Sequence, residues 1–251
     1  MADARDALME RLLRDAGLAP GQRVLDLGCG QGEVSLMAAR LVGPTGRVLG
    51  LDREAEPLDQ ARRRVEKLGF TNLDFAQADL DAPPAEQGRF DAIIGRRVLM
   101  YLADPGLTLR RLLPALQPGG LVVFQEHDAT GLARERPVLP LHQRCQALIW
   151  ETVRREGANV HLGLELHPLL SAAGLWVEGV RVELAVALPE EPYPLAQIIR
   201  AMLPRIVGQG LARAEELDLD HLEQRLRQEQ AEANAVFLGD LVCGVWARKP
   251  A

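Results

Sequence analysis

The chain has 251 residues, of which 47% are hydrophobic and 25% are charged, and its formal net charge at pH 7 is -6. This length and apolar content allow a full core, so a single α/β domain over residues 1–251 is expected. The negative charge and the lack of a dense Lys/Arg block argue against nucleic acid as a partner, because phosphate neutralisation needs a concentrated basic face.

The cysteine spacing and the hydropathy of the chain predict its cellular compartment. Cys29, Cys145 and Cys243 are far apart and form no C-x-x-C pair. This pattern fits a reducing cytoplasm and predicts no metal site. No segment has the continuous apolar run of a signal peptide or a membrane span, so we expect a soluble cytoplasmic protein with no membrane partner.

A predicted leading helix, residues 1–20, precedes the stretch around which the chain is organised. Residues 24–32 read VLDLGCGQG, a short apolar strand followed by a glycine turn, and a helical pattern begins at Glu33. The glycines allow a sharp turn and close approach of a ligand, and the start of the following helix offers unpaired N–H groups to a polar ligand. This arrangement predicts a nucleotide-like cofactor.

The spacing within the turn separates two classes of cofactor. A dinucleotide fingerprint would need glycine at position 33, where Glu33 stands. The form D-x-G-x-G-x-G, beginning at Asp26, instead resembles motif I of class I S-adenosylmethionine (SAM) dependent methyltransferases. Two later stretches, GRRVLMYLADP and PALQPGGLVVFQEHD, resemble the ubiquinone/menaquinone-biosynthesis-like branch of that family. The resemblance covers residues 24–128, is weak from residue 129 onward, and implies SAM as cofactor.

Acidic residues follow the next two predicted strands. Asp52 follows residues 47–51, and a carboxylate there, about 20 residues beyond the glycines, is placed for ribose hydroxyls, although it could instead cap the next helix. After the third strand, residues 73–78, the resemblance implies Asp79 for the adenine amino group and the Leu80 N–H for the ring, with Asp81 as the rival position.

A basic residue after the fourth strand, residues 90–94, completes the expected cofactor site. We favour Arg96 for the cofactor carboxylate or for an acidic group of the substrate, because Gly95 leaves it room. The full set of expected cofactor-binding residues is Asp26, Gly28, Cys29, Gly30, Asp52, Arg53, Asp79, Leu80 and Arg96.

A candidate catalytic residue follows the fifth strand, residues 121–125. Methyl transfer from a sulfonium has a neutral leaving group, so the enzyme mainly positions the acceptor, but a hydroxyl or an acidic carbon also benefits from a base. His127 is the best candidate for that base, with a purely structural histidine as the alternative. Tyr101, His161 and His167 are weaker candidates for the acceptor pocket.

The remaining chain predicts a sixth strand at residues 175–188 and a seventh at residues 236–247, the reversed hairpin of the methyltransferase sheet. We therefore expect a Rossmann-like sheet of seven mostly parallel strands with helices on both faces and an antiparallel last strand. Residues 21–128 form the cofactor-binding core, and residues 129–174 and 189–234 are substrate-side insertions. The second insertion is either a helical lid or a packing and dimerisation element.

The predicted function is methyl transfer from SAM to a small molecule at oxygen, nitrogen or carbon, in secondary metabolism or on a quinone-like substrate. After the fourth strand there is no N/D-P-P-Y/F and no Pro-Cys, which argues against methylation of nucleic acids. The alternatives are an NAD(P)-dependent oxidoreductase and a non-catalytic SAM-binding protein. The sequence leaves the oligomeric state open, a homodimer included.

Overall fold

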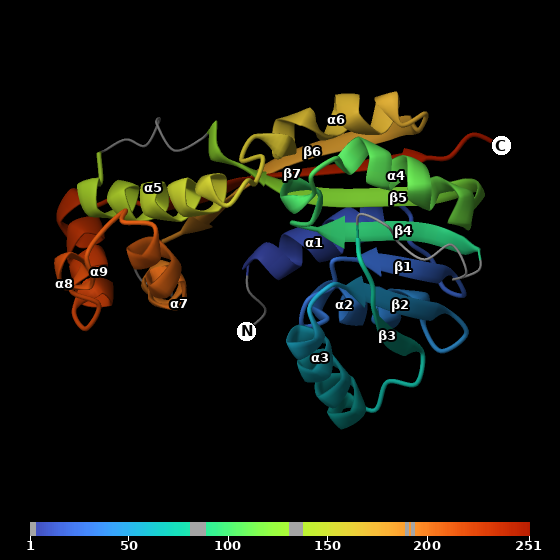
Figure 1. Cartoon of the computed structure of the whole chain (residues 1–251), viewed down its shortest axis with the longest axis horizontal. Coiled ribbons are helices and arrows are strands. Elements are labelled where there is room, and N and C mark those ends of the chain that lie inside the picture. The colour runs from blue at the N-terminus through green and yellow to red at the C-terminus, as the bar shows by residue number, and fades with distance from the viewer. Residues whose placement is uncertain (1–3, 81–88, 131–137, 189–190, 192–193) are drawn as a thin grey trace. The chain divides into compact units, whose positions relative to one another are not determined.

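The computed structural model describes residues 4–80, 89–130, 138–188, 191 and 194–251 (Figure 1). The strands are β1 (Arg23–Leu27), β2 (Arg47–Asp52), β3 (Leu73–Gln77), β4 (Phe90–Arg96), β5 (Leu116–Asp128), β6 (Trp176–Ala187) and β7 (Phe237–Arg248). The α-helices are α1 (Ala4–Asp15), α2 (Glu33–Val42), α3 (Ala55–Leu68), α4 (Pro105–Leu112), α5 (Pro140–Arg155), α6 (Leu162–Ala172), α7 (Leu195–Gly208), α8 (Ala214–Leu217) and α9 (Leu222–Ala233). Two short 3₁₀ helices, η1 (Leu99–Tyr101) and η2 (Leu113–Ala115), flank α4.

The seven strands form one sheet in the order β3-β2-β1-β4-β5-β7-β6 (Figure 1). Strands β1 to β5 are parallel, and Leu27 at the end of β1 pairs with Leu51 of β2 on one side and with Gly95 of β4 on the other. The carboxyl ends of parallel strands meet at one edge of the sheet, which is where open α/β sheets bind their ligands. The residues that follow β1, β2, β3 and β4 are therefore brought together.

The last strand runs against its neighbours. Lys249, just after β7, accepts the N–H of Gly119 and donates its own N–H to Gly120, both at 2.9 Å, near the start of β5. Arg248 at the end of β7 pairs with Glu178 near the start of β6, at 3.2 Å. This antiparallel strand and the strand order confirm the predicted Rossmann-like fold.

The chain divides into two compact units. The first contains the residues up to His127 together with residues 162–183 and 242–251, and the second contains residues 128–161 and 184–241. Both predicted insertions contribute to the second unit, but helix α6 clusters with the first, so the substrate-side segment expected at residues 129–174 is divided between the two units.

The core of the first unit explains the position of the glycine turn. Helices α1 and α2 pack their apolar sides against β1 and β4, and the buried side chains include Met9, Leu12, Met37, Val24 and Ile94. Gly244 in β7 permits this packing, because a Cβ there would lie 2.6 Å from Leu12 Cδ2. The end of β1 is thereby held firmly at the start of the turn.

The second unit has its own buried contacts, formed around α5. The ring of His142 stacks on Phe237 with 4.4 Å between centroids, and Trp150 Nε1 donates to Asp240 at 3.2 Å. Gln230 of α9 donates to the carbonyl of Ala187 at 3.0 Å. Within the described parts of both units, none of the helices combines the length and the apolarity that crossing a bilayer requires.

Candidate cofactor site

The turn after β1 is built from three glycines with positive φ angles, 67° at Gly28, 52° at Gly30 and 81° at Gly32. A Cβ on Gly28 would lie 2.4 Å from Val98 Cγ2, and a Cβ on Gly32 would lie 2.9 Å from the ring of Phe75. Both positions therefore require glycine for conformation and for space.

Gly30 differs from its two neighbours because no atom lies within 4 Å of the position that its Cβ would take. Its N–H donates to Asp52 Oδ2 at 2.8 Å, and the other carboxylate oxygen accepts the N–H of Glu54 at 3.0 Å. Each carboxylate oxygen can accept two hydrogen bonds, so Asp52 stabilises the turn and can still accept a hydrogen bond from a ligand. Both interpretations of Asp52, turn ligand and local cap, are compatible with this geometry.

Asp26 lies beneath the turn rather than on its surface. Its side chain is 1% exposed, Oδ2 accepts the hydroxyl of Ser35 at 2.5 Å, and Oδ1 has no hydrogen-bond partner in the described part of the chain. Burial raises the pKa of Asp26 to about 7. This placement ties β1 to α2 and favours a positioning role over the direct cofactor contact expected from the sequence.

Four other predicted residues lie at or near the same edge of the sheet. Cys29 is buried, its N–H donates to the carbonyl of Leu51 at 2.9 Å, and burial raises the pKa of its thiol. Arg53 is exposed, with its Nε 3.5 Å from a carboxylate oxygen of Glu54. Asp79 is exposed and Leu80 is buried after β3, whereas the rival residue Asp81 lies outside the described residues.

Arg96 at the end of β4 has a partner that the sequence did not predict. Its Nη1 donates to Asp6 Oδ1 of α1 at 2.8 Å, and the two side chains are 17% and 26% exposed. Arg96 also lowers the pKa of Asp26 through its positive charge. The guanidinium therefore lies in the acidic surroundings of the turn, and a bound carboxylate would share it with Asp6 or displace Asp6.

Glu126, near the end of β5, has a structural function in the first unit. Its Oε1 accepts the N–H groups of Val98 at 3.0 Å and Leu99 at 2.8 Å. These two donors lie at the start of η1, where a helix supplies no backbone acceptor of its own. Burial raises the pKa of Glu126 to about 7. This function of Glu126 was not predicted from the sequence, because its partners are 27 and 28 residues away and no local motif marks them.

His127 follows directly and is 2% exposed in this conformation. The neighbouring Asp128, which begins the second unit, accepts the N–H of Thr130 at 2.8 Å, and its Oδ1 lies 3.5 Å from His161 Nδ1. The His161 side chain is 58% exposed. Within the second unit, a buried carboxylate thus faces an accessible imidazole, a pairing that the sequence did not predict.

The other two weaker candidates are not associated with this pair. Tyr101 accepts a hydrogen bond from Arg97 at 3.1 Å in the first unit, and His167 is exposed on α6. Among the residues that the structure describes, no group of three or more His, Cys, Asp or Glu side chains could hold a metal ion.

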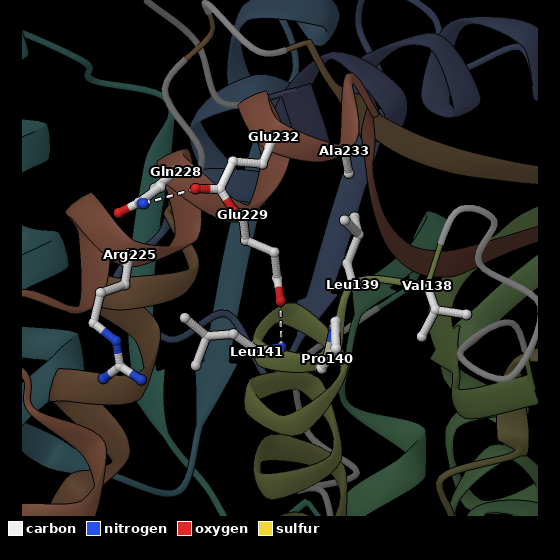
Figure 2. A pocket seen from close by; sticks show the side chains of 9 residues that line it. All are labelled: Val138, Leu139, Pro140, Leu141, Arg225, Gln228, Glu229, Glu232 and Ala233. Carbon is white, nitrogen blue, oxygen red and sulfur yellow. Dashed lines mark hydrogen bonds between the residues drawn. The ribbon is translucent and has the colours of Figure 1, made fainter.

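The second unit also contains a pocket of about 530 Å³ between the start of α5 and the side of α9. Figure 2 shows Glu229 of α9 directed at the start of α5, where its carboxylate accepts the N–H groups of Leu141 at 2.6 Å and His142 at 2.9 Å. Gln228 donates to Glu232 at 2.7 Å beside it. The helix start is therefore already satisfied by a carboxylate of the chain itself.

The strand order, the glycine turn after β1 and the acid after β2 together define the class I SAM-dependent methyltransferase fold. A sequence model of the family described as "Methyltransferase domain" matches residues 18–174. Because this match spans more than half of the chain, the protein belongs to the methyltransferase domain family.

Two relatives from the sequence comparison illustrate the relationship. An uncharacterised 37.1 kDa protein of a Streptomyces fradiae transposon is 33% identical over 71% of this chain and 50% of its own length. The demethylmenaquinone methyltransferase of Lactococcus lactis is 29% identical over 59% of this chain and 56% of its own length. The chain thus spans about half the length of these relatives.

Solved structures share the fold at lower sequence identity. A putative methyltransferase from Bacillus halodurans C-125 has a TM-score of 0.67 at 17% identity and covers 98% of this chain and 100% of its own. Phosphoethanolamine N-methyltransferase 2 of Haemonchus contortus, solved in complex with SAM, has a TM-score of 0.62 at 20% identity and covers 98% of this chain and 53% of its own. The cyclase SpnF has a TM-score of 0.61 at 21% identity, and the match covers 99% of this chain and 82% of the SpnF chain.

Proposed function

We propose that the chain transfers the methyl group of SAM to a small-molecule acceptor, with the cofactor bound against the turn from Gly28 to Gly32. The observation that carries this proposal is the pair formed by Gly30 and Asp52. The main chain at Gly30 is open on one side, and a carboxylate with remaining acceptor capacity lies beside it. The family match supports the same conclusion.

The residues at the sheet edge fit this cofactor in chemistry and in placement. Asp52 would accept hydrogen bonds from the ribose hydroxyls, and the exposed Asp79 with the Leu80 N–H would hold adenine. Arg96 would share its charge between Asp6 and the cofactor carboxylate. We assign Gly28, Cys29 and Asp26 to the shape of the turn and Arg53 to the rim of the site.

When bound, SAM supplies a methyl group made electrophilic by the sulfonium, and the remaining work of the chain is positioning and exclusion of water. We propose His127 as the residue that orients the acceptor or removes its proton. Because His127 is 2% exposed, such contact requires a local rearrangement when the acceptor binds. The accessible His161, paired with Asp128, is the second candidate for that proton.

For the acceptor, we propose a small phenolic or quinol-like molecule methylated at carbon or oxygen, with an amine as the competing class. Support comes from curated relatives named demethylmenaquinone methyltransferase, whereas the phosphoethanolamine N-methyltransferase neighbour supports only the fold at its level of identity. The family match lends no support to a nicotinamide-dependent oxidoreductase.

The test combines binding with turnover, because the cyclase SpnF shows that this fold is not restricted to proteins named as methyltransferases. The full chain is incubated with SAM and, in turn, with a naphthoquinol, a phenol and a primary amine, while formation of S-adenosylhomocysteine is followed. Acceptor-dependent product that is lost in Asp52→Ala and kept in Asp74→Ala, an exposed aspartate on β3, supports the proposal. Saturable SAM binding without product from any acceptor would favour a non-catalytic SAM-binding protein.

A further inference from the structure

Two exposed polar side chains project from the segment that follows β4. Residues 98–100 of this segment are buried, whereas Arg97 and Tyr101 on either side of them are exposed. Both lie just beyond the carboxyl end of β4, and the carboxyl ends of parallel strands form the ligand-binding edge of such a sheet. The two side chains are therefore placed at the same edge as the glycine turn.

Buried contacts hold this segment against the glycine turn. The side chain of Val98 occupies the space beside Gly28, where a Cβ would lie 2.4 Å from Val98 Cγ2. In addition, the buried carboxylate of Glu126 accepts two N–H groups at the start of η1. The exposed pair thus extends from a firmly held turn that contacts the proposed cofactor site.

Arg97 has a backbone conformation that residues other than glycine rarely adopt. Its φ is 54°, in the left-handed region, and its N–H donates to the carbonyl of Gln125 in β5 at 2.8 Å. Strained residues of this kind cluster at functional sites. Since glycine would fit the same conformation without strain, an arginine here indicates that its side chain has a function.

The guanidinium of Arg97 has a neutral partner. Its Nη2 donates to the hydroxyl of Tyr101 at 3.1 Å, and no carboxylate pairs with it in the part of the chain that the structure describes. The neighbouring Arg96, by contrast, is paired with Asp6. Arg97 lowers the pKa of Glu126 through its charge, but Glu126 Oε2 accepts no hydrogen bond from any described residue. Arg97 is therefore a cation at the ligand edge with donors left for an anion.

We propose that Arg97 and Tyr101 bind an anionic group of the methyl acceptor, a carboxylate or a phosphate, and so select acceptors that carry one. Because the tyrosine oxygen accepts a hydrogen from Arg97, its own hydrogen is left to donate to the ligand. A guanidinium N–H and a phenolic O–H then converge on one anion, and guanidinium donors match the oxygens of carboxylates and phosphates. This inference rests on the proposed methyl transfer and adds to it the charge of the acceptor.

The first test compares two probes that differ only in charge, 3-hydroxybenzoate and its methyl ester. Their affinities for the full chain are measured by ligand-observed NMR titration at neutral pH, with and without SAM. The wild type should prefer the acid. Arg97→Gln should lower the affinity for the acid by about 10 to 100-fold, the range for a charge-assisted hydrogen bond, and leave the ester unchanged. Tyr101→Phe should cost the acid about 2 to 10-fold.

The matched control is Arg110→Gln, at an exposed arginine in the last turn of α4, and it should leave both affinities unchanged. Arg97→Lys should keep part of the preference for the acid, because it retains the charge but not the planar donors.

A second variant separates ligand binding from a structural role of Arg97. Arg97→Gly relieves the backbone strain, so the midpoint of urea unfolding should not fall below that of wild type, while the preference for the acid disappears. If Arg97→Gly instead loses stability and keeps the preference, Arg97 is structural and the proposal is wrong.

The binding assay does not depend on methyl transfer, so the two proposals fail separately. A wild-type chain with no preference for the acid over its ester would overturn the anion site, whatever its turnover. An Arg97-dependent preference for the acid in a chain that does not bind SAM would support the anion site and overturn the methyl transfer. Titration of 3-hydroxyphenyl phosphate then distinguishes the two sources, since the tighter of the two anions identifies the group that the site takes.

Discussion

The N–H of Gly30 donates to the carboxylate of Asp52 across two adjacent parallel strands, with 2.8 Å between the atoms. This bond joins the glycine turn after β1 to the acid after β2, which the sequence placed 22 residues apart. It holds an acceptor-bearing side chain beside the one glycine of the turn whose Cβ direction is open. The proposed cofactor site is built around this pair.

The two glycines of the turn should respond differently to substitution. Gly28→Ala would place a Cβ 2.4 Å from Val98 Cγ2 at a positive φ, so we expect a loss of about 2 to 4 kcal/mol in the free energy of unfolding. Gly30→Ala meets no atom within 4 Å and should lose only about 1 to 2 kcal/mol, from backbone strain. In the folded Gly30→Ala protein, however, SAM affinity should fall, because the methyl group occupies the open side.

Urea unfolding and calorimetric titration of SAM separate these two effects. Equal losses of stability in Gly28→Ala and Gly30→Ala would contradict the described packing. Undiminished SAM affinity in Gly30→Ala would remove Gly30 from the site.

Glu126 predicts a pH dependence of stability. Its pKa is about 7 in the folded chain and 4.5 in the unfolded chain, so between these values the folded state holds a proton that the unfolded state has lost. The free energy of unfolding should therefore fall as the pH rises from about 4.5 to 7, by about 3 kcal/mol from this group. Glu126→Gln should reduce that slope, and Asp26, whose pKa is also raised to about 7, should account for a remaining part.

Urea unfolding at pH 5 and pH 8 measures this difference in wild type and Glu126→Gln. Asp91→Asn, at a carboxylate that binds the N–H of Arg23 and is not buried, is the control. If wild type and Glu126→Gln lose the same stability between the two pH values, Glu126 is ionised throughout and its proposed protonation is wrong.

His127 should affect turnover rather than cofactor binding. If it orients or deprotonates the acceptor, His127→Ala should lower kcat by about 10² to 10⁴-fold while SAM affinity stays nearly constant. His221→Ala, at an exposed histidine just before α9, is the control and should leave both unchanged.

The pH profile of kcat distinguishes His127 from His161. A rise of kcat with pH between about 6 and 7 that disappears in His127→Ala supports His127 as the base, because a general base must be deprotonated to act. If this rise survives in His127→Ala and disappears in His161→Ala, the proton is taken by the imidazole beside Asp128, and His127 is not the base.

The part of the fold and site that could be predicted rests on local patterns. The strand before Asp26, the turn from Gly28 to Gly32 and the acid at Asp52 all follow from residues within a few positions of one another. Strand β5 is longer than predicted, Leu116–Asp128 rather than residues 121–125. At its start Leu116 pairs with Phe90 of β4, and Gly119 and Gly120 pair with Lys249 at the other end of the chain. No local pattern contains that partner.

Distant partners also explain why the surroundings of some site residues were not predicted. Arg96 pairs with Asp6, 90 residues earlier, and Glu126 binds the main chain of Val98. Ser35 is closer to its partner Asp26, and a hydroxyl in the first turn of the helix after motif I was a usable signal. The alternation of residues 175–188 was readable as a strand, but only the structure shows that Val180 and Val182 lie on its exposed face.

The most direct measurement is calorimetric titration of SAM into the full chain and into Asp52→Ala, with Asp74→Ala as the control. We expect saturable binding at one site per chain in wild type and in Asp74→Ala. In Asp52→Ala we expect a SAM affinity lower by about one to two decades, the loss that follows removal of a carboxylate that accepts charge-assisted hydrogen bonds from a ligand. Absence of SAM binding to the wild-type chain, or unchanged affinity in folded Asp52→Ala, would contradict the proposed cofactor site.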